Sequence, residues 1–355
     1  MIRGFKAPLL ALTVAIVVAG ATSAVAQTQL GSHARPGSAL FFPVYDTGEN
    51  DRSTETIITV TNTNSSTIAC PNNNVQGDVF VHFVYFDGEE CEEENLGELL
   101  TPGDTITLLT SRHNSNGTQG WLWVEAWDPE LMEAIDYDFL IGSAIIVKSN
   151  NASDTDFLFS YTPYTFRGLV SSCTAPGSQS RCGYCLTDEN SNNAADFNGN
   201  EYECFPGTLY LDMFFAEGQT WPVGSGDTTG NQLYLMIPEG IGGNDTFRLS
   251  LRIWDNSEDP SSRTLSTNCW FNGSLSDLSG RVLADNIGGD PEELPGLLTG
   301  WMRLRAEDRS DNSTYGMLGV YAHQLLDGGG GVTSAAGHEL HFEGKADNDV
   351  SIGRF

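Results

Sequence analysis

Four arginines of this chain lie at alternating positions in two short segments. Arg248 and Arg252 belong to the first segment. Arg303 and Arg305 belong to the second, which begins at Trp301. Successive strand residues point to opposite sides, so each pair shares one side of its strand. If the two strands are neighbours, they form a cationic patch. A guanidinium group can bond a carboxylate or sulfate through two N–H donors, so this patch could bind the anionic groups of a polysaccharide.

The overall charge offers a second interpretation of the patch. The chain has 47 acidic and 17 basic residues and a formal net charge of −30 at pH 7. With so many carboxylates present, the arginines could instead pair with the protein's own Asp and Glu side chains. The same charge repels nucleic acids and anionic membranes, so neither is expected as a partner. Acidity of this kind is otherwise typical of a soluble surface.

A second candidate surface is aromatic. The segment WLWVEAW places Trp121, Trp123, Glu125 and Trp127 on one side of a strand. The indole rings could stack on sugar rings, and Glu125 could accept hydrogen bonds from sugar hydroxyl groups. Alternatively, a contiguous apolar patch of this size is buried against another layer or another part of the protein. Exposure of the three tryptophans in the folded protein distinguishes the two hypotheses.

Oxygen-bearing side chains at alternate positions indicate a candidate calcium loop. Asp196, Asn198 and Asn200 resemble the start of such a loop, because hard cations prefer oxygen ligands. The EF-hand pattern requires glycine at the sixth position, where this chain has Glu201. The alternative is an ordinary Asn-rich turn. Calcium is the one cofactor that the sequence suggests.

Motifs for catalysis are weak in this sequence. It contains neither a Gly-x-Ser-x-Gly nucleophile motif nor a His-Glu-x-x-His zinc motif. Glycoside hydrolysis needs two carboxylates, and so many acids make some pair inevitable. Glu125 and Asp128 are the pair in the least unfavourable context. We therefore predict no catalytic residue, and keep a polysaccharide hydrolase as the alternative function.

Seven cysteines in a chain with an export signal favour disulfides. Cys182 and Cys185 also have zinc-ligand spacing, but a second such pair is missing, which favours disulfides over zinc. Cys269 stands alone in its part of the sequence. The odd count leaves one thiol free or paired between chains. The disulfide candidates are Cys70, Cys91, Cys173, Cys182, Cys185, Cys204 and Cys269.

Two pairs of segments repeat each other in the same order. Residues 120–126 (GWLWVEA) correspond to residues 300–306 (GWMRLRA), and residues 81–87 (VHFVYFD) correspond to residues 249–255 (LSLRIWD). All four alternate with the period of a strand. The side that is apolar in both copies is predicted to face the core. The other side differs between the copies, and a specific partner is expected to contact it.

The chain is predicted to be all-β, with two related antiparallel β-sandwich units joined by a disulfide-rich connector. Many short alternating strands separated by polar turns resemble immunoglobulin-like modules in architecture. The predicted divisions are a signal peptide (1–26), an N-terminal extension (27–37), the first unit (38–170), the connector (171–206), the second unit (207–343) and a C-terminal tail (344–355).

The leader sets the expected compartment. Arg3 and Lys6 precede an apolar run, and Ala24-Val25-Ala26 is typical of a cleavage site, so we expect secretion or display at the cell surface. No later segment is long and apolar enough to cross a membrane as a helix. The predicted function is non-enzymatic: binding a polysaccharide or other extracellular polymer, or self-association through the β-sandwich faces.

Overall fold

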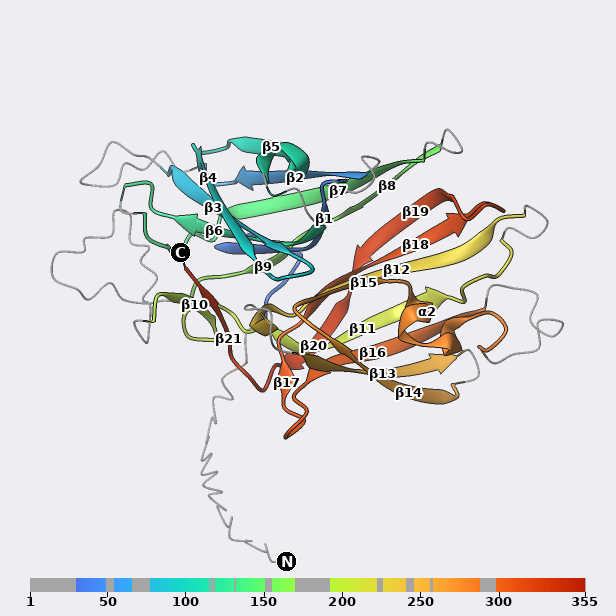
Figure 1. Cartoon of the computed structure of the whole chain (residues 1–355). Coiled ribbons are helices and arrows are strands. Elements are labelled where there is room, and N and C mark those ends of the chain that lie inside the picture. The colour runs from blue at the N-terminus through green and yellow to red at the C-terminus, as the bar shows by residue number, and fades with distance from the viewer. Residues whose placement is uncertain are drawn as a thin grey trace, which may run out of the picture.

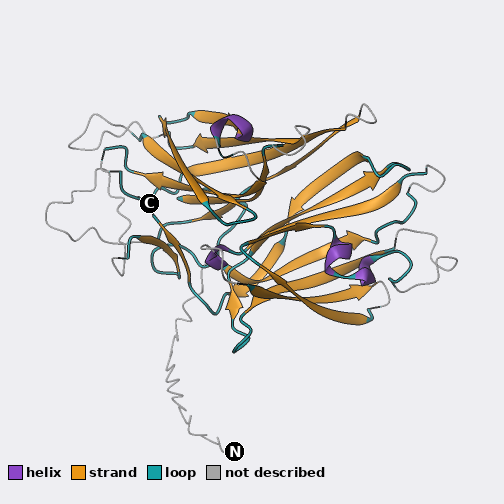
Figure 2. Ribbon diagram, viewed as in Figure 1, coloured by secondary structure: helices purple, strands orange, loops and turns teal. Residues whose placement is uncertain are grey.

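The computed structural model describes residues 30–48, 54–65, 77–114, 116, 119–130, 132–150, 155–169, 192–221, 226–240, 246–255, 258–287 and 298–354. The predicted signal peptide lies outside them. The described chain is all-β and forms several antiparallel sheets, as Figure 2 shows. Helix is confined there to short turns: α1 (Thr110–His113), α2 (Leu275–Leu278), η1 (Pro238–Gly240) and η2 (Gly280–Val282). No helix in the described ranges is long and apolar enough to cross a membrane.

The N-terminal half of the chain forms two sheets. A five-stranded sheet has the order β4-β3-β6-β1-β9, and a four-stranded sheet has the order β5-β2-β7-β8 (Figure 1). Side chains from both sheets meet in one buried cluster. The strands are β1 (Ala39–Asp46), β2 (Thr54–Asn62), β3 (Val79–Asp87), β4 (Glu93–Leu100), β5 (Thr105–Leu109), β6 (Gln119–Trp127), β7 (Leu140–Asn150), β8 (Thr155–Tyr161) and β9 (Tyr164–Phe166).

The C-terminal half repeats this strand order. A six-stranded sheet has the order β14-β13-β16-β11-β20, with β17 paired to β16, and a four-stranded sheet has the order β15-β12-β18-β19. The strands are β11 (Pro206–Phe215), β12 (Thr228–Met236), β13 (Phe247–Asp255), β14 (Pro260–Thr267), β15 (Trp270–Gly273), β16 (Thr299–Glu307), β17 (Thr314–Tyr315), β18 (Leu318–Leu326), β19 (Val332–Glu339) and β20 (His341–Lys345).

Registers match as well as strand order. Val124 is the partner of Phe83 in the first half, and Leu304 is the partner of Leu251 in the second. Both β1 and β11 carry an irregularity at the same place along their pairing with β6 and β16. Gly120 and Gly300 occupy equivalent positions, and a Cβ atom on either would lie within 2.5 Å of a neighbouring carbonyl oxygen. This close backbone approach explains why both copies have glycine there.

The two halves pack against each other. The buried cluster of the first half includes Met236, Trp270, Leu318 and Val320 from the second half. Trp270 Nε1 donates a hydrogen bond to the carbonyl of Pro43 at 3.0 Å. Figure 1 shows β8 and β19, the outer strands of the two four-stranded sheets, running close to each other, and these strands are in contact.

Two of the disulfide candidates are paired in the structure. Cys91 is bonded to Cys269 across a sequence separation of 178 residues. Cys91 lies in the turn between β3 and β4, and Cys269 directly precedes β15, so the bond links the two halves. Cys204, a disulfide candidate, is instead a buried free thiol. Burial raises the pKa of this thiol. The remaining candidates, Cys70, Cys173, Cys182 and Cys185, lie outside the described residues.

A two-stranded ribbon covers the first five-stranded sheet. It consists of β10 (Ala194–Phe197) and β21 (Val350–Gly353), which pair antiparallel. Phe197, with Tyr202 and Phe205 from the chain that follows it, is buried in the core of the first half. Three aromatic residues near the end of the predicted connector, 171–206, thus join this core.

Candidate functional site

The outward side of β13 and β16 is the candidate site, and we call it the arginine face. The two strands are hydrogen-bonded neighbours, with Arg252 opposite Arg303 and Ser250 opposite Arg305. The residues between them, such as Leu304, are buried in the core of the second half. Alternation therefore directs the arginines outward. The face consists of Arg248, Ser250, Arg252, Trp254, Trp301, Arg303, Arg305 and Glu307.

Arg248 pairs with the protein's own carboxylate. Its Nη2 atom lies 2.8 Å from Glu307 Oε2. Ser250 Oγ donates to the same oxygen at 2.6 Å. Asn312 accepts a further hydrogen bond from Arg248. Arg248 is therefore paired with a carboxylate of the protein itself, as the second interpretation of the patch expects, and Glu307 largely neutralises its charge.

The other three arginines have no carboxylate within ion-pair distance among the described residues. Arg305 Nε donates to Thr208 Oγ1 at 3.0 Å, which fixes the guanidinium without neutralising it. Arg252 lies 4.9 Å above the ring of Trp254. Trp254 in turn stacks on Trp301, with ring centroids 3.7 Å apart. A cation over an aromatic ring is stabilised while it keeps its charge.

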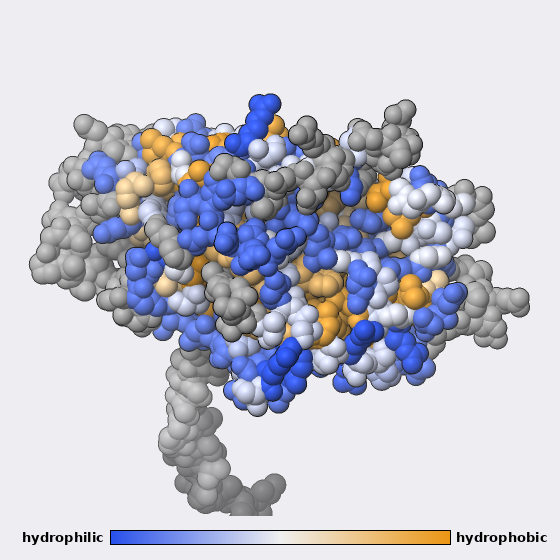
Figure 3. Space-filling view, viewed as in Figure 1, coloured by the Kyte–Doolittle hydropathy of each residue, from blue (hydrophilic) through white to orange (hydrophobic). Residues whose placement is uncertain are grey.

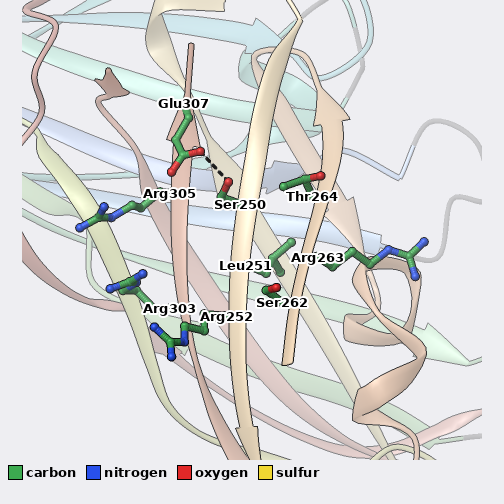
Figure 4. A pocket seen from close by; sticks show the side chains of 9 residues that line it. All are labelled: Ser250, Leu251, Arg252, Ser262, Arg263, Thr264, Arg303, Arg305 and Glu307. Carbon is green, nitrogen blue, oxygen red and sulfur yellow. Dashed lines mark hydrogen bonds between the residues drawn. The ribbon is translucent and has the colours of Figure 1, made fainter. Parts of the chain in front are cut away.

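A shallow cavity of about 340 Å³ lies at this face. Figure 4 shows that Arg252, Arg303 and Arg305 extend to the same side of the strands, whereas Arg263 on β14 extends away from them. The neighbouring carboxylate Glu343 accepts a hydrogen bond from Tyr210 at 2.7 Å, and that bond raises the pKa of the tyrosine.

The face of the molecule drawn in Figure 3 has no dominant apolar area. Figure 3 shows mostly hydrophilic side chains on this side of the molecule, with apolar residues in small patches between them.

The equivalent side of β3 and β6, which we call the aromatic face, is covered. Trp121 and Trp123 have no exposed surface, and Trp127 is partly exposed. Phe197 of the ribbon packs edge-on against Trp123, with ring centroids 6.4 Å apart. A sugar ring therefore cannot reach Trp121 or Trp123 in this structure, and the covering layer comes from the same chain.

Glu125 is also inaccessible, and its neighbours were not foreseen from the sequence. Trp127 Nε1 and the hydroxyl of Tyr202 each donate to Glu125 at 2.6 Å. Arg354, at the end of β21, places Nη2 2.8 Å from Glu125 Oε1 and also pairs with Glu201. The side chains of Glu125 and Glu201 are fully buried, and the side chain of Arg354 is 9% exposed. Glu125 therefore cannot serve as a catalytic acid beside Asp128, itself nearly buried.

Burial shifts the pKa values of two groups at this cluster, Glu201 and His82. Desolvation raises the pKa of Glu201 to about 7, although Arg354 acts in the opposite direction. Burial also lowers the pKa of His82, which lies on the same face. The indole N–H groups of Trp121 and Trp123 have no hydrogen-bond partner among the described residues. The sequence signal for this cover is slight: Val350 and Ile352 alternate with polar residues, as in a half-buried strand.

The candidate calcium loop forms a turn closed by its own hydrogen bonds. Asn198 Oδ1 accepts the backbone N–H of Asn200 at 2.8 Å, and Gly199 N–H donates to the carbonyl of Tyr202. Asp196 lies in β10 and is nearly buried. In the part of the chain that is described, no group of three or more His, Cys, Asp or Glu residues is placed to hold a metal ion.

Comparisons with known proteins identify no family for this chain. No protein-family model matches it, and no curated protein matches it significantly. The crystal structure of Thermotoga maritima 1070 is similar over 40% of this chain and 98% of that chain, at 10% identity and a TM-score of 0.25. The N-terminal CBM22-1-CBM22-2 tandem domain of Xyn10C from Paenibacillus barcinonensis is similar over 80% of this chain and 82% of that chain, at 12% identity and a TM-score of 0.16. At these TM-scores neither likeness carries an argument.

Proposed function

We propose that this protein is exported and non-enzymatic, and that it binds an acidic polysaccharide through the arginine face. One observation carries the proposal. Arg252, Arg303 and Arg305 share one side of two neighbouring strands without a carboxylate partner among the described residues. The chain has 47 acidic residues, so pairing with the protein's own carboxylates was readily available. Three cations left unpaired in such a chain favour an anion from outside.

Electrostatics favour binding at this place despite the negative charge of the whole protein. Arg252 and Arg303 are cross-strand partners. Cα atoms of such partners lie about 4.5–5.5 Å apart, so the two side chains start close together and their charges repel. Charges farther away than about 8 Å are largely screened at physiological ionic strength. An anionic group near the face therefore meets the local field of the arginines together with that of Glu343 and Asp347, and it relieves the repulsion between Arg252 and Arg303.

The shape of the site supports binding over hydrolysis. The arginine face is the outer side of a sheet, and its cavity is shallow. Hydrolysis of a glycosidic bond needs two accessible carboxylates flanking the bond. Of the pair named from the sequence, Glu125 is fully buried and held by Arg354. Among the residues that the structure describes, no contact favours the hydrolase alternative.

The proposal includes the architecture and the compartment. Matching strand orders, registers and irregularities support two related β-sandwich units of the immunoglobulin-like kind. The bond between Cys91 and Cys269 supports an oxidising compartment, where disulfides persist, and agrees with the predicted leader. Both observations support secretion or display at the cell surface.

The test is retention on immobilised polysaccharides. Polygalacturonate and dextran sulfate carry the anionic groups, and uncharged dextran is the neutral control. The wild-type protein should be retained on the acidic polymers and eluted by salt, because screening weakens exposed charge pairs. Replacing Arg303→Ser and Arg305→Ser together should abolish retention without changing the melting temperature.

Two controls accompany this test. The variant Arg112→Gln removes one exposed arginine from α1 in the other half of the chain and should be retained like the wild type. Light scattering of the free protein reports whether the arginine face instead joins two copies. Equal retention of the wild type and the double variant on the acidic polymers would contradict the proposal, as would release of reducing sugar from them.

A further inference from the structure

The two halves of the chain carry opposite charges at one equivalent position. Glu125 is the cross-strand partner of His82, and Arg305 is the cross-strand partner of Ser250. Counted from the matching glycines, Gly120 and Gly300, the two residues occupy the same register position. The first half therefore shows how a charged group at this position is satisfied. In the second half, Asp347 interacts electrostatically with Arg305 but accepts its hydrogen bonds from Thr314, and no described carboxylate forms an ion pair with Arg305.

In the first half, an extended strand satisfies the charge. β21 lies over the sheet as part of the ribbon, and its end brings Arg354 to the buried carboxylate of Glu125. Trp127 on the sheet and Tyr202 on the covering segment each donate a hydrogen bond to that carboxylate and hold it in place. The pair is thus an oriented ion pair between the sheet and a chain that crosses it.

In the second half, the sheet supplies the cation. Arg305 is half-buried, and its Nε atom is held by the hydroxyl of Thr208 on β11, which is 6% exposed. The two terminal nitrogen atoms of the guanidinium have no described acceptor. A guanidinium fixed through Nε loses little rotational freedom when it binds a bidentate anion, so less of the binding energy is lost in ordering it.

We infer that Arg305 is the primary anchor for the acidic polysaccharide, and that Thr208 is the residue that positions it. This inference rests on the proposed function. An anionic group of the polymer takes the place against Arg305 that Arg354 takes against Glu125, with the charges reversed. Arg303 and its cross-strand partner Arg252 lie two residues further along their strands on the same face. They contact the next anionic group along the polysaccharide. The ligand class is an extended polymer with carboxylate or sulfate groups, lying over the sheet as the ribbon lies over its counterpart.

The experiment measures binding of polygalacturonate oligomers by calorimetry at fixed ionic strength. Arg305→Gln should weaken binding by about tenfold or more, because a charge-assisted hydrogen bond contributes about 1.5–3 kcal/mol. Arg303→Gln should weaken binding less than Arg305→Gln does. Thr208→Val should weaken binding although every arginine is kept, and Thr208→Ser, which keeps the hydroxyl, should restore it. Arg112→Gln is the matched control and should bind like the wild type.

The outcomes separate the inference from the proposed function. Suppose that the wild type binds. If Arg303→Gln then weakens binding as much as Arg305→Gln does, or if Thr208→Val leaves binding unchanged, the anchor assignment is overturned and the proposed function stands. Absence of binding to polygalacturonate and dextran sulfate by the wild type would overturn both. Melting temperatures of all variants within a few degrees of the wild type show that the comparison concerns folded proteins.

Discussion

Removing Arg354 tests the buried charge cluster under the ribbon. The variant Arg354→Met keeps much of the side-chain length but leaves Glu125 and Glu201 without their cation. Both carboxylates are fully buried. Leaving a buried charge uncompensated costs about 3–5 kcal/mol, whereas losing an exposed ion pair costs about 0–1 kcal/mol. We therefore expect the free energy of unfolding to fall by about 3–5 kcal/mol.

A second substitution shows whether the cost comes from the stranded carboxylate. In the double variant Arg354→Met, Glu125→Gln, the neutral amide can still accept from Trp127 and Tyr202. The double variant should be more stable than Arg354→Met alone by about 1 kcal/mol or more, because one uncompensated charge is gone. Urea unfolding followed by tryptophan fluorescence is the assay, since Trp123 packs against Phe197 of the ribbon. A loss below about 1 kcal/mol for Arg354→Met, the range of an exposed pair, would refute this reasoning.

Two further predictions concern pH and the disulfide. The pKa of Glu201 is raised to about 7 in the folded state, above its ordinary value of 4.5, so its contribution to stability is complete below pH 4.5 and is lost as the pH rises through 7. A pKa shift of this size corresponds to about 3 kcal/mol of stability. Glu201→Gln should therefore make the melting temperature less dependent on pH between pH 5 and pH 8. An unchanged pH profile would contradict the raised pKa of Glu201. The bond between Cys91 and Cys269 closes a loop with a sequence separation of 178 residues. Replacing both cysteines by Ser should lower the free energy of unfolding by about 5 kcal/mol at most, because that is the loop-closure entropy that the bond removes from the unfolded chain. Denaturant unfolding of the variant against the oxidised wild type measures this, and equal midpoints would show that the two halves are held together without the bond.

Strand positions and the inward side of each strand were predictable because they depend on local alternation. The segments 81–87 and 249–255 fall within β3 and β13, and the segments 120–126 and 300–306 fall within β6 and β16. Their apolar side faces the core in both halves, as with Val124 and Leu304. The matching glycines were visible in the sequence, although the carbonyl approach that requires them was not.

Cysteine pairing was not predictable in the same way. Cys91 and Cys269 meet because the turn after β3 lies beside the start of β15, and this proximity depends on how the two halves pack. Spacing along the chain carries no information about a contact across 178 residues. The free thiol of Cys204 follows from the same packing, since its neighbourhood in the cover brings no described sulfur within bonding distance.

The sequence by itself determined which side of each strand is apolar in both copies, and that the other side differs between them. The alternation of side chains is a property of the strand backbone, so it can be read locally. Only the tertiary structure decided which of the two differing sides is open. Trp123 is covered because Phe197 and β21 return to it from distant parts of the chain, whereas Arg303 and Arg305 have no such described cover. What packs on a strand is a long-range property, and the residues of that strand do not encode it.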